Sequence, residues 1–225
     1  MIHIEREMLA LKEGTQQMWR LVISQLEKAK QALLDRDVAL ALEVVSREKR
    51  VDAFELKIDS DCENYIALYN PVAIDLRLCL SLIKISNTLE RIGDFAAGIA
   101  RHVMDEDCNN LDPELFEDLQ LESMLDIVLG MLSDGFAALE HENTKISGKI
   151  LAKDEEVNAI YHQSFEVLST YLVNNPAKSN CGLKVFLLMR RVERIGDHCC
   201  NIVEEIVFYI DAKVLKHHGK NLKKQ

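Results

Sequence analysis

Two identical pentapeptides contain the carboxylates that could do chemistry in this chain. The sequence Glu-Arg-Ile-Gly-Asp occurs twice, 103 residues apart in a chain of 225. Residues four apart lie on one face of a helix, so Glu90 pairs with Asp94, and Glu193 pairs with Asp197. The recurrence indicates a duplicated unit, and each copy places two carboxylates beside the same apolar helix face.

Local energetics do not favour this arrangement. Like charges at i and i+4 destabilise a helix by about 0.2–0.5 kcal/mol, and a glycine inside a helix costs about 1 kcal/mol relative to alanine. Gly93 and Gly196 stand inside both copies, and such a glycine indicates that another backbone or a bulky ligand comes close. A single Glu-x-x-x-Asp pair usually lies on a solvent-exposed helix face. Here the charge repulsion and the helical glycine both occur twice at matching positions, which favours a functional site.

The segment before the first pair supplies further carboxylates. Its acids follow helical steps of four, three and four residues and form one acidic stripe: Glu48, Asp52, Glu55 and Asp59. Packed against Glu90 and Asp94, this stripe would gather more carboxylates than a dry interface tolerates without cations. Oxygen-only clusters suit hard or borderline metals such as iron, manganese or magnesium. The alternative for the stripe alone is an exposed acidic face without metal.

The second half has fewer potential ligands. Asp154 and Asn158 stand at the first two positions of the corresponding stripe, whereas Tyr161 and Phe165 replace its last two acids. We therefore expect a second site that binds fewer metals, or one that binds none and serves as a docking face.

Four other residues are weaker candidates. Glu204 continues the acidic face of the second pair, and His198 directly follows Asp197. For His198 we expect a role in the core, or in holding the metal ligands in place, in preference to a role as a metal ligand. Asp75 and Arg77 could form a helix cap with an ion pair, or part of a partner surface.

Apolar positions at helical spacing dominate the chain, and no alternating strand pattern is convincing. Six long helices are expected, at residues 4–34, 38–69, 71–108, 113–140, 145–173 and 180–216. Short connections between three helices in each half predict an all-α fold of two antiparallel three-helix bundles, related by an internal pseudo-two-fold repeat. The halves would span residues 1–110 and 111–225, with the junction at 108–112.

Composition excludes several functions. A net charge of −10 argues against nucleic-acid binding, which requires cations to replace phosphate counterions. No apolar run approaches a membrane span, and the first residues lack the order of a signal peptide. Six cysteines without Cys-x-x-Cys spacing (62, 79, 108, 181, 199, 200) predict reduced, mostly buried thiols in a cytosolic protein. The basic residues 213–224 are expected to be a solvated end, with membrane-surface contact as the minority interpretation.

A catalytic role also lacks support in the sequence. Carboxylate-bridged di-metal oxidases use Glu-x-x-His pairs, and no histidine here has a glutamate three residues before it. No nucleophile–base arrangement is readable from spacing. We predict a protein that is not an enzyme, with a metalloenzyme or metal-storage bundle as the alternative.

These motifs resemble the PhoU family of bacterial phosphate-uptake regulators. The resemblance rests on both pentapeptides, on Asn201 to Glu204 after the second, and on residues 51–59 and 71–77. It implies two three-helix bundles. In some members of the family, multinuclear iron, or zinc, nickel or another metal, binds to paired acidic motifs. Carried over by position, the implied metal ligands here are Glu55, Asp59, Glu90 and Asp94 in the first half, with Glu48 and Asp52 nearby, and Asp154, Glu193 and Asp197 in the second.

The resemblance also implies partners. Members of the family repress the phosphate-starvation response when phosphate is plentiful, and are thought to bridge the ATP-binding subunit of the phosphate ABC transporter and the membrane sensor histidine kinase. We therefore expect a cytoplasmic regulator that reaches the membrane through its partners. Whether it forms a homodimer is open at this stage.

Overall fold

The computed structural model describes residues 2–105 and 113–214, and within them every regular element is a helix. The first half contains α1 (Ile2–Asp35), α2 (Val38–Ser46), α3 (Glu48–Tyr69) and α4 (Ala73–Val103). The second half contains α5 (Pro113–Asp118), α6 (Leu121–Glu140), η2 (Thr144–Ile146), α7 (Ser147–Asn174), η3 (Pro176–Lys178) and α8 (Ser179–Asp211). The predicted all-α fold class is confirmed.

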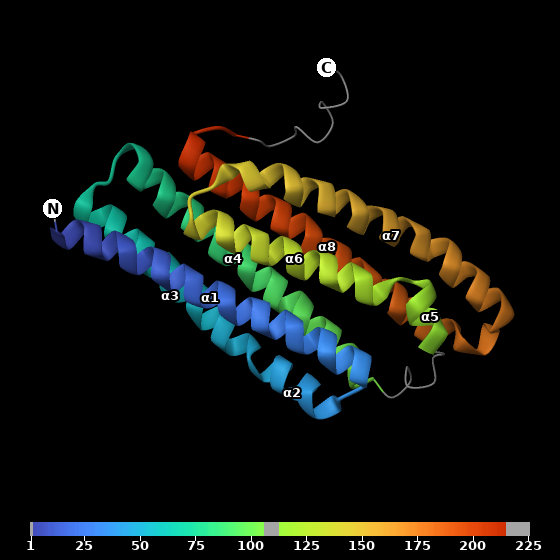
Figure 1. The fold of residues 1–225 in the computed structure, drawn as a ribbon. Helices are drawn as coiled ribbons and strands as arrows, with labels where there is room; N and C mark the ends of the chain where they lie inside the picture. The colour runs from blue at the N-terminus through green and yellow to red at the C-terminus, as the bar shows by residue number, and fades with distance from the viewer. Residues whose placement is uncertain (1, 106–112, 215–225) are drawn as a thin grey trace, which may run out of the picture.

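Each half is an antiparallel bundle of three long helices. In the first half α1 and α3 pack on α4, and in the second half α6 and α7 pack on α8. The two bundles join through α4 against α8 and α1 against α6, and Figure 1 shows α1 and α6 side by side with α7 at the upper edge. The Trp19 indole crosses this junction and donates to the Leu132 carbonyl oxygen at 3.1 Å. One continuous apolar core therefore unites both halves.

Two helices expected to be continuous are broken. The helix predicted for residues 38–69 is interrupted at Arg47, which ends α2 and begins α3. Buried Gln25 of α1 stabilises this break, because its Nε2 donates to the Val44 carbonyl oxygen (3.3 Å) at the end of α2. The helix predicted for residues 113–140 is broken before α6, where Gln120 has a left-handed backbone with φ of 52°.

The last helix ends earlier than expected. We predicted that it reaches residue 216, but α8 ends at Asp211 because Ala212 adopts the left-handed conformation that commonly terminates helices. The predicted junction at 108–112, Cys108 and most of the basic tail lie outside the described residues. The five cysteines within the described residues are free thiols, four of them buried. No helix of the described segments combines the length and apolar character of a membrane span.

Candidate metal centre

The two repeated glycines lie against side chains of the neighbouring helix. A Cβ atom on Gly93 of α4 would stand 3.3 Å from Val51 Cγ1 of α3. A Cβ atom on Gly196 of α8 would stand 2.9 Å from Asp154 Oδ1 and 3.5 Å from Val157 Cγ1, both on α7. The sequence predicted another backbone or a bulky ligand beside each glycine, whereas the structure places side chains of neighbouring helices there, so only the close approach itself is confirmed. Each glycine thus lets an acid-bearing helix pack directly beside the repeated carboxylates.

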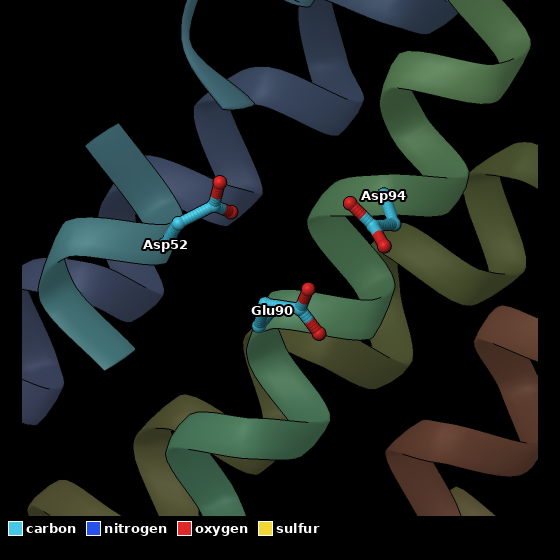
Figure 2. Close-up of side chains that lie close together, drawn as sticks. All are labelled: Asp52, Glu90 and Asp94. Atoms are coloured by element: carbon cyan, nitrogen blue, oxygen red, sulfur yellow. The ribbon is translucent and has the colours of Figure 1, made fainter. Parts of the chain in front are cut away.

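In the first half this packing gathers three carboxylates. Asp52 on α3 and Glu90 and Asp94 on α4 each offer an oxygen atom, and these atoms lie within 4.8 Å of one another. Figure 2 shows Asp52 extending from α3 toward α4, where Glu90 and Asp94 stand on successive turns. Asp52 and Glu90 are half-buried, and Asp94 is exposed. We call these three residues the acidic triad.

The acidic triad contains more negative charge than its surroundings neutralise. Burial, followed by the nearby charges of Asp94, Glu55 and Asp52, raises the pKa of Glu90 to about 7. Burial and the neighbouring Glu48 also raise the pKa of Asp94. An acid near like charges resists ionisation, and a bound cation would reverse that effect. The geometry and the electrostatics therefore fit a cation with oxygen ligands.

The other three acids of the first-half stripe have polar partners. Arg101 donates to Glu48, Asn87 donates to Glu55 at 3.3 Å, and Ser86 donates to Asp59 at 3.4 Å. The structure thus places Asp52 with Glu90 and Asp94, whereas Glu55 and Asp59 extend along the same face. Sequence reasoning did not assign roles to Arg101, Asn87 or Ser86. Their helical spacing from the pentapeptide on α4 is the sequence feature that could have identified them.

The second half brings its acids together differently. Asn158 donates to Asp154 Oδ2 at 3.1 Å, and the Cys200 thiol also donates a hydrogen bond to the Asp154 carboxylate. Burial and the charge of Asp197 raise the pKa values of both Asp154 and Glu193. Asp197 lies 3.6 Å from Arg194. Within the described residues only the acidic triad brings three candidate ligand atoms this close, so the thinner second site expected from the sequence has no equivalent cluster.

His198 lies at the interface of the two halves. Its ring stacks on Phe95, the residue at the corresponding position of the first copy, with ring centroids 5.6 Å apart. Burial and the charges of Arg194 and Arg91 lower the pKa of His198 to about 4. This environment matches the expected core residue and offers no support for a ligand. Glu204 is half-buried on α8, about two turns beyond Asp197.

The candidate partner-surface residues lie at the start of α4. Asp75 is exposed in the first turn. Arg77 is half-buried, and its Nε donates to the Tyr209 carbonyl oxygen of α8 at 3.1 Å. Arg77 therefore ties the two halves together, and a role of either residue in partner binding stays a prediction.

Comparison with known proteins places this fold and these motifs in one family. The PhoU domain model matches residues 15–103 and again residues 121–206. The phosphate-specific transport system accessory protein PhoU homolog of Aquifex aeolicus is 32% identical over 94% of this chain and 95% of its own length. The Escherichia coli accessory protein PhoU is 31% identical over 95% of this chain and 87% of its own length. The crystal structure of PhoU from Pseudomonas aeruginosa matches with a TM-score of 0.87 at 27% identity, over 93% of this chain and 99% of that one. Two matched PhoU domains, the full-length relatives and the shared fold show that this chain belongs to the PhoU family.

Proposed function

We propose that this protein is an accessory protein of a phosphate-specific transport system and regulates phosphate uptake and the phosphate-starvation response. The support is its similarity along most of the chain to proteins of that name. These relatives are named as accessory proteins and not as enzymes. In this proposal the protein acts by binding other proteins in the cytoplasm, and it catalyses no reaction.

We propose further that the acidic triad binds a metal ion. Three carboxylates converging from two helices, with the pKa of Glu90 raised to about 7 by burial and like charge, support this assignment. An all-oxygen ligand set fits iron, manganese or magnesium better than zinc or nickel, which also favour nitrogen and sulfur ligands. A bound cation would neutralise the triad and link α3 to α4. The residues that would hold it are Asp52, Glu90 and Asp94, with Glu55 beside them.

The proposed partners are the ATP-binding subunit of the phosphate ABC transporter and the phosphate sensor histidine kinase. An adaptor transmits a signal only if it binds one state of a partner more strongly than another state. Metal bound between α3 and α4 would fix the shape and charge of that face. The face could then discriminate between transporter states that differ in the surface they present.

The regulatory role is tested in cells of the source organism. Deletion of the gene should raise expression of a phosphate-starvation reporter in phosphate-rich medium. The double variant Asp94→Ala with Asp197→Ala should do the same, whereas Glu13→Gln, which changes an exposed acid of α1, should behave as the wild type. Unchanged reporter expression after deletion would refute the proposed function. Full repression in the double variant would refute only the link between the acids and regulation.

A further inference from the structure

An aromatic cluster occupies the second-half positions where the first half has acids. Tyr161 and Phe165 on α7 correspond to Glu55 and Asp59 on α3. Phe186 of α8 lies between them, stacked on Tyr161 with centroids 5.6 Å apart and edge-on to Phe165 at 6.2 Å. The two halves have thus diverged at this site, from carboxylates in one to interacting aromatic rings in the other.

Exposed apolar side chains neighbour this cluster along α7 and α8. Phe165 is 64% exposed, and on the neighbouring turns of α8 Leu183 and Leu187 are 62% and 52% exposed. Contiguous exposed apolar side chains on a soluble surface mark an interaction site more often than single ones do. We call the five residues the aromatic patch: Tyr161, Phe165, Leu183, Phe186 and Leu187.

Acids continue the same face beyond the aromatic patch. On α7 Asp154 and Asn158 precede Tyr161 and Phe165 in steps of four, three and four residues, so all four share one side of the helix. On α8 Glu193 and Asp197 follow the patch. Eleven residues separate Asp154 from Phe165, or about 16 Å along a helix. The face therefore has an apolar end and an acidic end, about three helical turns apart.

The acidic end brings three carboxylates together, Asp154 on α7 and Glu193 and Asp197 on α8, close enough for their charges to interact. Asn158 donates to Asp154 Oδ2 at 3.1 Å. Arg190 and Arg194 of α8 offset part of the negative charge near Glu193. Arg194 lies 3.6 Å from the Asp197 carboxylate, longer than a hydrogen bond. Asn158 replaces a carboxylate of the first half, which leaves the acids too few and too separated to match the acidic triad.

We propose that the face formed by α7 and α8 is a docking site for a basic amphipathic helix of a partner protein. Its apolar side chains would cover the aromatic patch, and its lysine or arginine side chains would reach Asp154, Glu193 and Asp197. Aromatic residues on such surfaces often supply most of the binding energy, and complementary charges set orientation and specificity. This inference deepens the proposed function, because it names a surface and a partner chemistry for the proposed adaptor.

The test uses the purified full-length protein and a synthetic peptide. The probe is a labelled amphipathic peptide of about 18 residues, with leucines at helical spacing at one end and lysines at the other. A twin peptide has glutamates in place of the lysines. Fluorescence anisotropy measures binding to the wild type and to Phe165→Ser, and Leu56→Ser is the matched control because Leu56 of α3 is also 67% exposed. Both side chains are solvent-exposed, so circular dichroism should show unchanged folding.

The lysine peptide should bind the wild type and Leu56→Ser equally, and Phe165→Ser about tenfold more weakly. Asp197→Asn should also weaken it, and the glutamate peptide should bind more weakly than the lysine peptide. Equal binding of both peptides, or no effect of Phe165→Ser, would overturn the proposal. Binding to vesicles of anionic phosphatidylglycerol that Phe165→Ser abolishes would instead identify a membrane surface as the occupant. Because the assay contains no transporter, its failure would leave the gene-deletion test of the proposed function intact.

Discussion

Substituting Glu90 with glutamine should stabilise the metal-free protein at alkaline pH. Glutamine keeps the shape of the side chain but removes the charge that burial and the neighbouring acids disfavour. In the unfolded chain Glu90 ionises near its ordinary pKa of 4.5, whereas in the folded protein its pKa is raised to about 7. The folded state therefore binds the proton more tightly, and wild-type stability falls as the pH rises through that window.

The size of the effect follows from the difference between the two pKa values. A tenfold change in proton affinity corresponds to about 1.4 kcal/mol, so the full difference would be worth about 3 kcal/mol. Solvent screens a partly exposed carboxylate, which reduces the expected gain in the free energy of unfolding to about 1–2 kcal/mol. For a domain of this size that gain raises the melting temperature by several degrees.

The assay is urea unfolding of wild type and Glu90→Gln at pH 5 and pH 8, with a chelator present throughout. Glu13→Gln, at an exposed position of α1, controls for the loss of one negative charge. The Glu90→Gln variant should exceed the wild type in stability at pH 8, and the difference should shrink at pH 5. An equal difference at both pH values, or a variant less stable than the wild type at pH 8, would refute the electrostatic account of the acidic triad.

Three further changes test the packing around the site. Gly196→Ala should destabilise the protein by about 0–2 kcal/mol in urea unfolding, because the new Cβ would meet Asp154 Oδ1 at 2.9 Å. The steric cost of about 1–3 kcal/mol is offset by the gain of about 1 kcal/mol from replacing a helical glycine with alanine; a stabilised variant would contradict this packing. His198 has a folded pKa of about 4 against an ordinary value of 6.5, so stability is lost as the pH falls through that range. His198→Phe should remove that loss, on the order of 2 kcal/mol, in unfolding midpoints compared at pH 7 and pH 4.5. Arg77→Ala should lower stability by about 1 kcal/mol and speed hydrogen exchange near Tyr209, whose carbonyl oxygen Arg77 contacts; unchanged exchange would show that this contact contributes little.

The repeated pentapeptide predicted much of the architecture correctly. A motif that recurs together with its glycine predicts the same helix–helix contact in both halves. The spacing of apolar residues that predicts a helix is a local pattern, so it can be read without knowing which distant residues are in contact. Gly93 and Gly196 could therefore be recognised as contact points from the sequence alone. The helix breaks at Arg47 and Gln120 could not be recognised, since neither position contains proline or glycine. The first break depends on Gln25, a hydrogen-bonding partner from another helix.

The composition of the acidic triad was only partly predictable for a related reason. Helical spacing placed four acids on one stripe of α3, but it does not say which of them faces Glu90 and Asp94. That choice depends on how α3 crosses α4, and the structure selects Asp52. Arg101 neutralises Glu48, and this contact joins residues more than fifty positions apart in the chain. Likewise, the aromatic substitutions at 161 and 165 were visible in the sequence, whereas their contact with Phe186 required the structure.

The most direct test of the account is elemental analysis of the protein purified without a metal-affinity tag. Wild type, Asp94→Ala and Asp197→Ala would be prepared in parallel and compared for bound iron, manganese, magnesium, zinc and nickel. The account predicts metal in the wild type and in Asp197→Ala, and its loss in Asp94→Ala, because only the first half gathers three carboxylates. Metal retained in Asp94→Ala, lost only in Asp197→Ala, or missing from the wild type would contradict the assignment of the acidic triad as the metal centre.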